Sequence, residues 1–218
     1  MIHGFKGNKT TTAEEWLIDY SLKTGNSIDI NTDLLDMPIK FDGKEVDAFI
    51  LDVLDNKLVI QLVLPIVANF DVKSNRYKTS YARELINSNE FLSRFNSEFV
   101  KRIQLTEVHT EDYVTNDKLW LLSHEEINQC SDDLLKPNHE CHAFEMFKTI
   151  DLKVYSRIML GLIGKKINAY GWRLRSACPI SSYNTNKHVG IVNYYGLIGY
   201  NYAHYAADGA LLPACTIC

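Results

Sequence analysis

Two turn dipeptides set between apolar runs place the strongest constraint on the fold of this 218-residue chain. Asp42-Gly43 separates residues 37–41 from residues 45–54, and Asp55-Asn56 separates the latter from residues 57–64. Both dipeptides can take the positive φ angles of tight hairpins, so the pattern predicts an antiparallel strand meander. Residues 57–64 are almost continuously apolar, which favours a strand covered on both faces. A sheet is therefore expected to begin near residue 37.

Helical and strand patterns then alternate along the chain. Ser80 can cap a helix that begins at residue 81, and the phenylalanines from 91 to 99 continue at steps of three and four. Further on we expect strands over residues 102–109 and 118–122, a capping box at Ser123-His124-Glu125-Glu126 opening a short helix, an inserted loop over 130–140, and a helix over 152–162. The order sheet, helices, sheet, helix, without repeated βαβ units, predicts an α+β fold.

Residues 1–36 differ in composition from the rest and are predicted to form an N-terminal arm. Thr11 or Thr12 can cap a short helix, and Gly25 can end it in the left-handed conformation. Trp16, Leu17, Tyr20 and Leu22 would form its apolar side. This arm could attach the protein to a partner, or the helix could pack on its own domain. The predicted division is an arm over 1–36 and an α+β domain over 37–218.

Composition argues against several classes of function. A net charge of −4 with scattered cations gives no field that attracts nucleic acid. No window approaches the roughly 18 apolar residues of a membrane span. The first residues lack the apolar core of a secretory signal, which predicts folding in a reducing cytoplasm. The five cysteines are an odd number and form no disulfide framework.

The stretch from residue 170 to residue 218 holds seven of the twelve tyrosines, with asparagines and glycines, in short alternating segments. Flat amphipathic rings with few rotors and adaptable amides are what antibody loops use, and such rings stack on sugar faces. We therefore predict a ligand surface, although alternate tyrosines could instead simply pack a sheet. The candidate residues are Tyr183, Asn184, Asn186, Asn193, Tyr194, Tyr195, Tyr200, Asn201, Tyr202, His204 and Tyr205.

Other candidates favour structure over chemistry. A strand through residues 172–176 would bury Trp172, and Arg175 has the five donors of a structural hydrogen-bonding hub. The donors Cys130, His139, Cys141 and His142 lack zinc spacing, and Cys215 and Cys218 end the chain instead of opening a helix. Acid and base pairings of His109 with Glu111 or Asp112, and of His204 with Asp208, lack a nucleophile. No metal, cofactor or catalytic residue is predicted.

Three segments together resemble one family of bacteria and bacteriophages. The first is residues 80–95, with an Arg-x-Leu-x-Asn core at Arg83, Leu85 and Asn87 followed by Glu90-Phe91-Leu92 and Phe95. The second is residues 115–126, and the third pairs residues 172–176 with Leu212-Pro213-Ala214. Arg173, Ala177 and Leu212 depart from that family's pattern. The family is one of unknown function whose domain looks like the C-type-lectin and sulfatase-modifying-factor type of fold.

That resemblance implies a lectin-like mixed sheet with flanking helices, a structural role for Pro213 and a ligand surface in the C-terminal half. It also implies a setting on a bacteriophage tail or head. The leading expectation is thus a non-enzymatic virion-surface protein, synthesised in the host cytoplasm, that binds a host glycan or protein. Other virion proteins would contact the N-terminal arm, and a homo-oligomer is expected. The alternatives are a purely structural capsid or tail protein and an enzyme acting on cell-envelope material.

Overall fold

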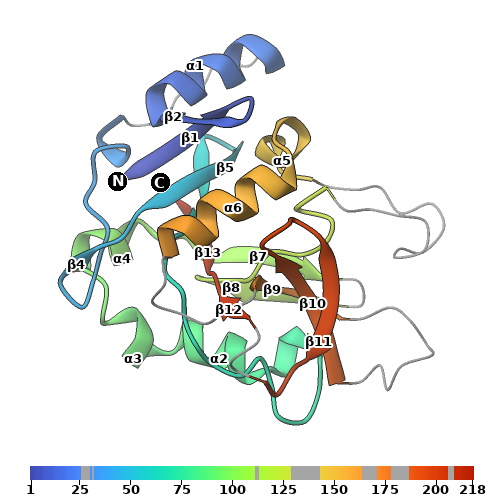
Figure 1. Cartoon of the computed structure of the whole chain (residues 1–218). Helices are drawn as coiled ribbons and strands as arrows, with labels where there is room; N and C mark the ends of the chain where they lie inside the picture. Colours follow the sequence, from blue (N-terminus) through green and yellow to red (C-terminus); the bar gives the residue numbers. More distant parts are fainter. Residues whose placement is uncertain are drawn as a thin grey trace.

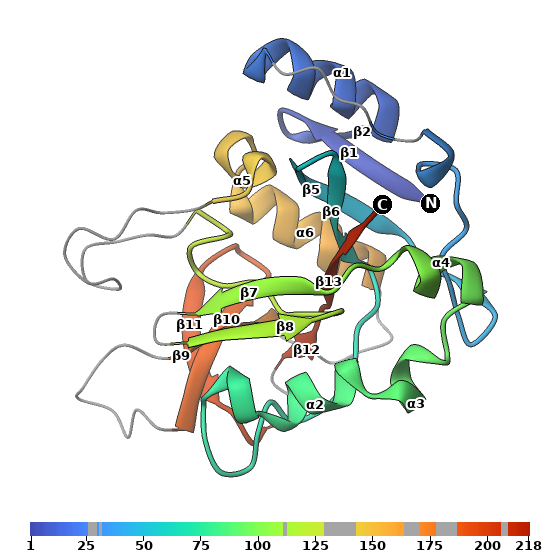
Figure 2. The same cartoon turned by 180° about the vertical axis from the view of Figure 1, so that it is seen from behind.

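The computed structural model describes residues 1–25, 30, 32–110, 113–128, 143–163, 171–177, 187–205 and 209–218. Two larger sheets and two short hairpins combine with separate helices, which is an α+β architecture as predicted (Figure 1). Seen from behind, the β7–β8 hairpin, formed by Thr106–Thr110 and Tyr113–Asp117, lies across the second sheet (Figure 2). The other small hairpin joins β3 (Lys40–Phe41) to β4 (Lys44–Glu45).

The first sheet has the strand order β13-β6-β5-β1-β2, and the second has the order β11-β10-β9-β12. The strands of the first are β1 (Ile2–Lys6), β2 (Lys9–Thr12), β5 (Ala48–Leu54), β6 (Lys57–Leu62) and β13 (Ala214–Ile217). Those of the second are β9 (Gly171–Ala177), β10 (His188–Asn193), β11 (Ile198–Tyr202) and β12 (Ala210–Leu211). The helices are α1 (Ala13–Thr24), α2 (Tyr81–Asn87), α3 (Asn89–Leu92), α4 (Ser97–Arg102), α5 (Glu145–Thr149) and α6 (Leu152–Ile163), with 3-10 turns at Thr32–Leu34 and Tyr77–Thr79.

The predicted meander is confirmed in part: the Asp55-Asn56 turn joins β5 to β6 in the first sheet, but the Asp42-Gly43 turn joins β3 to β4 in a separate two-stranded sheet. Asp42 and Gly43 have φ angles of 50° and 75°, and Asp55 and Asn56 have 49° and 58°. The left-handed Asp55-Asn56 turn lets β5 and β6 pair antiparallel. The apolar start of β5 is fully buried, so this hairpin forms the centre of the first sheet.

The N-terminal residues belong to the same sheet. β1 forms a parallel pair with β5 and an antiparallel pair with β2. The sequence pattern predicted neither β1 nor β2. Helix α1 packs on β1 through buried Trp16, and a Cβ at Gly4 would lie 2.2 Å from the Cβ of Trp16. Of the two possible states of this helix, packing on its own domain is therefore the one observed.

The ends of α1 follow the sequence. The Thr12 hydroxyl accepts the Glu15 N–H at the start, and Gly25, with φ of 70°, ends the helix. The assignment of Leu22 to the apolar side is wrong, because 79% of its surface is exposed. It lies on the face that turns away from β1.

Three short helices, α2 to α4, replace one longer helical run. Ser80 and Ser88 each accept an N–H three residues later, so each starts its own helix. The predicted phenylalanine face is buried, with Phe91 3% and Phe99 0% exposed. The predicted helix over 152–162 is α6, whose Tyr155 ring lies within 6.2 Å of rings in β1, β5 and β9 and so bridges the two sheets.

Residues 118–128 depart from the prediction. The expected strand over 118–122 is reduced to one bridge, between Trp120 and Ala214. The capping box does form, because Ser123 and Glu126 exchange hydrogen bonds of 2.9 and 3.2 Å. It supports a single turn only, since Asn128 takes a φ of 59°. The expected loop over 130–140 lies outside the described residues.

The last segment joins the two sheets. In β12, Leu211 pairs with Arg173 of β9, and two residues later the Pro213 carbonyl accepts the Leu62 N–H of β6. Ala214 then opens β13 beside Gln61. The predicted structural position of Pro213 is thus the crossing point between the sheets.

Candidate functional site

The β10–β11 hairpin carries most of the described candidate residues. His188 lies opposite Tyr202 at one end, and Val192 lies opposite Ile198 at the other, next to the turn. These pairs are four residues apart along β11, which is about 13 Å in a strand. The tyrosines predicted as one surface are therefore divided between two ends of the hairpin.

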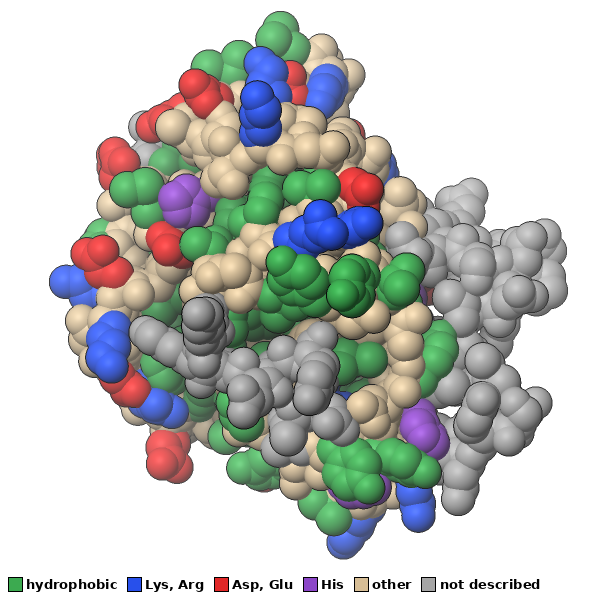
Figure 3. Space-filling view, viewed as in Figure 1, with side chains coloured by type: hydrophobic (Ala, Val, Ile, Leu, Met, Phe, Trp, Pro, Cys, Tyr) green, Lys and Arg blue, Asp and Glu red, His purple; other side chains and the backbone are tan. Residues whose placement is uncertain are grey.

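Four rings meet at the open end of the hairpin, and we call them the ring cluster: His188, Tyr202, His204 and Tyr205. The Tyr202 ring centre lies 4.2 Å from that of His188, 5.2 Å from His204 and 5.4 Å from Tyr205. Tyr202 is 38% and Tyr205 48% exposed. Figure 3 shows this end at the lower right, where histidine side chains lie beside aromatic and apolar ones.

A buried arginine holds the ring cluster from below. Arg173 in β9 is fully buried, and its guanidinium donates 3.2 Å to the Tyr202 carbonyl and also to the Tyr205 carbonyl. A planar guanidinium fixes two acceptors in one geometry. The turn that follows β11 is thereby fixed relative to the second sheet.

The candidate asparagines use their carbonyl ends within the hairpin itself. Asn193 Oδ1 accepts the N–H groups of Tyr195 at 2.8 Å and Leu197 at 3.1 Å. Asn201 Oδ1 accepts the Tyr202 N–H at 2.7 Å. These amides shape the turn and the strand end, the local role that asparagine commonly has in turns.

Tyr200 departs from the expected exposure. It is half-buried, and its ring meets the His124 ring edge-on at 5.7 Å. Because strand side chains alternate, Tyr200 points to the same side as Tyr202 but lies further along, over the protein interior. It is a packing residue at the base of the hairpin. Tyr183, Asn184 and Asn186 lie outside the described residues.

His124 lies under the hairpin with 3% of its surface exposed. Burial lowers its pKa to about 4, and among the described residues its Nε2 has no hydrogen-bond partner. A Cβ at Gly190 of β10 would lie 2.6 Å from this nitrogen, so glycine permits the close approach. The imidazole is therefore neutral and closed to solvent at pH 7.

Arg175, the predicted hub, lies in the centre of a polar core. Its guanidinium donates to the carbonyls of Leu121 at 2.7 Å and His109 at 2.8 Å, and makes two bonds of 2.5 and 2.9 Å to the Glu126 carboxylate. The arginine is 2% exposed. Trp172, in the same strand, is fully buried in the hydrophobic core.

The other motif residues extend this polar core. Arg83 of α2 pairs with Asp117 of β8, which is 1% exposed, at 2.7 Å. The Asn87 side chain accepts the N–H groups of Lys118 and Leu119 and donates to the Leu119 carbonyl. The segments that carry the family resemblance thus bind one another inside the protein. These contacts stabilise the fold. The exposed rings of the ring cluster lie in a different part of the sequence.

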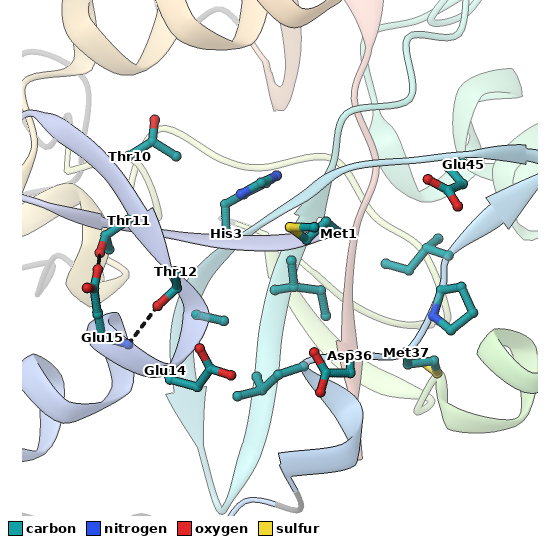
Figure 4. A pocket seen from close by; sticks show the side chains of 15 residues that line it. Met1, His3, Thr10, Thr11, Thr12, Glu14, Glu15, Asp36, Met37 and Glu45 are labelled. Atoms are coloured by element: carbon teal, nitrogen blue, oxygen red, sulfur yellow. Dashed lines mark hydrogen bonds between the residues drawn. The ribbon is translucent and has the colours of Figure 1, made fainter.

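A cavity of 580 Å³ lies at the far side of the first sheet, between β1, α1 and residues 35–39 (Figure 4). Its lining combines apolar side chains with four carboxylates, those of Glu14, Glu15, Asp36 and Glu45. A hydrogen bond from the Thr11 hydroxyl lowers the pKa of Glu15. The sequence patterns did not indicate this cavity, because its walls come from four separate segments.

In the described part of the chain, metal-binding side chains form no cluster of three or more. Cys130, His139, Cys141 and His142 lie outside that part, as do Glu111, Asp112 and Asp208. Cys215 is buried, which raises its thiol pKa, whereas Cys218 is exposed. Among the helices that are described, none is long and apolar enough to span a bilayer.

Together these features define an α+β domain with a rigid polar core and an exposed aromatic hairpin. A family model described as a domain of unknown function, DUF6273, matches residues 55–218, and the chain belongs to this family. The match begins in the β5–β6 turn, so β1, β2 and β5 extend the sheet beyond the matched region. No curated protein and no solved structure matches the chain.

Proposed function

We propose that this chain is a non-enzymatic binding protein whose ring cluster recognises a glycan or a protein on a host cell. The observation that carries the proposal is the exposure of Tyr202 and Tyr205 above a buried arginine that fixes their backbone. Rings that are already ordered lose little conformational entropy when a ligand binds. Their faces suit the apolar side of a sugar ring or of a protein side chain.

Two buried titratable groups have structural surroundings, which supports a non-catalytic use of each. In the described residues, the acid Asp52 and the base His124 have pKa values moved toward their neutral forms by burial. Asp52 is 8% exposed and caps α5 through the Glu145 N–H at 3.1 Å, which is a structural use. Reactive groups need access to a substrate.

A lectin-like fold and a bacteriophage virion setting are also part of the proposal, and they rest on the three motif segments. Exposed Ile18 and Leu22, on the outer face of α1, support a contact between the N-terminal residues and other virion proteins or a second copy. Mass spectrometry of purified particles tests the setting. If the chain is absent from purified particles, the virion setting is wrong and the protein binds its ligand as a cellular protein.

Two single variants test the ring cluster. Tyr202→Ala and Tyr205→Ala should each weaken binding on a glycan array or to host cells by tenfold or more, about the loss expected when a contacting ring is removed. Tyr81→Ala is the matched control, because Tyr81 on α2 is also 48% exposed but lies on another element. Wild-type binding that survives both ring variants would place recognition elsewhere. Release of products from cell-wall material would favour the enzyme alternative.

A further inference from the structure

The turn that joins β10 to β11 forms a second exposed surface. Tyr194 is 48%, Tyr195 60% and Leu197 63% exposed. Gly196 in this turn has a φ of 71°, and a Cβ there would lie 2.4 Å from the backbone nitrogen of Lys153. The turn therefore packs directly on the start of α6. The backbone of this turn is thus supported by a helix, at the opposite end of the hairpin from the ring cluster.

Helix α6 adds two cations to this turn. Lys153 and Arg157 are four residues apart, so they lie on the same exposed side of the helix. The Arg157 guanidinium carbon is 5.9 Å from the centre of the Tyr194 ring, which is cation–π distance. Near the centre of Figure 3, cationic side chains lie beside a row of exposed apolar and aromatic ones.

Neither cation is neutralised within the part of the chain that the structure describes. Nearby Glu145 is paired with Lys148 at 3.2 Å. Asp151 uses one carboxylate oxygen to accept the Lys153 backbone N–H at 2.8 Å, as a helix cap. No ion pair to Lys153 or Arg157 forms among these residues. The surface thus combines two available charges with two exposed phenol rings.

We infer that the turn and α6 bind an acidic polysaccharide. Exposed tyrosines offer a stacking face and hydroxyl groups for a sugar ring, and the two cations can pair with its carboxylate or phosphate groups. An anionic bilayer is less well matched, because interfacial binding needs a broad apolar face and only Leu197 offers an aliphatic side chain in this turn. The site lies about 13 Å along β11 from the ring cluster and is independent of it.

Titration calorimetry with oligogalacturonate, and with neutral dextran for comparison, tests the inference on the whole chain. Oligogalacturonate should bind, and its affinity should fall as salt is added. Arg157→Gln should weaken binding about tenfold, the loss expected for a charge-assisted hydrogen bond. Arg157→Lys should retain only part of the wild-type affinity, because lysine keeps the charge but lacks the planar guanidinium that lies over Tyr194.

Lys101→Gln is the matched control, since Lys101 is an exposed cation in the last turn of α4. It should bind like the wild type. An equal loss in Lys101→Gln would show attraction to overall charge and overturn the site. Binding to anionic phosphatidylglycerol vesicles without binding to oligogalacturonate would overturn the ligand class. Unchanged thermal unfolding of Arg157→Gln shows that any loss arises at the surface.

Discussion

The polar core and the ring cluster each depend on one arginine of β9, and they use it in different ways. Arg175 pairs with the Glu126 carboxylate and ties loop 118–128 and β7 to the sheet. Arg173, two residues earlier, donates to the backbone of the exposed Tyr202 to Tyr205 turn. The first contact holds elements together, and the second sets the shape of a surface. Conformational precision at the surface therefore depends on charges that are themselves buried.

Removing Arg175 should have the largest effect on stability. Arg175→Met leaves the Glu126 carboxylate, 15% exposed, without its cation, which costs about 3–5 kcal/mol of unfolding free energy. Urea unfolding followed by circular dichroism measures the loss.

The double variant Arg175→Met with Glu126→Gln should regain part of that free energy, because no buried charge then lacks a partner. If Arg175→Met unfolds at the wild-type urea concentration, the arginine is not the centre of the core.

His124 lies between the two regions and should make their connection depend on pH. Burial lowers its pKa from 6.5 to about 4, so the unfolded chain takes up this proton at a higher pH than the folded one. The stability that a neutral His124 contributes is complete above pH 6.5 and is lost as the pH falls toward 4. The total is about 3 kcal/mol.

His124→Gln removes this titration and should flatten the difference between unfolding free energies at pH 7 and pH 4.5. Asp52 works in the opposite direction, because burial raises its pKa, so the wild type and the variant must be compared at each pH. Parallel pH profiles for the two proteins would mean that His124 is solvated in the folded state.

Tyr200 in β11 and Tyr205 in the turn after it should give the smallest but most selective contrast. Tyr200→Ala removes a half-buried ring that packs on His124 and should cost about 2 kcal/mol of unfolding free energy. Tyr205→Ala removes an exposed ring and should change that free energy by less than about 0.5 kcal/mol while weakening ligand binding. Thermal unfolding and a binding assay on both variants separate the two roles. If Tyr205→Ala loses more stability than Tyr200→Ala, Tyr205 is the packing residue and the assignment of the two roles is wrong.

The sequence predicted the elements whose signals are local. Turn dipeptides placed the β5–β6 hairpin, and serine and threonine caps placed α1 and α2. β1 and β2 were not predicted. β2 is Lys-Thr-Thr-Thr and lies at a sheet edge, so the hairpin that it forms with β1 lacks an apolar pattern on that strand. The strand expected over 118–122 failed because side chains of Asn87 and Arg175 bind its backbone groups in place of a neighbouring strand.

The ligand surface was predicted by residue type but not by arrangement. Tyrosine and asparagine content indicated the hairpin, yet composition could not show that Tyr194 and Tyr195 would lie at the opposite end of the hairpin from Tyr202. Nor could it show that Arg173 would hold the exposed turn. These facts depend on pairing register, which is set by distant strands.

The crossing at Pro213 also bears on how fast the protein folds. Ala214 pairs with Gln61 and Ile217 with Leu58, so completing the first sheet requires contacts between residues more than 150 positions apart. Closing loops of that length loses chain entropy before any contact repays it, which slows folding in proteins rich in non-local pairs. Until this final segment docks, β6 presents an open apolar edge, and refolding at high protein concentration should therefore favour aggregation.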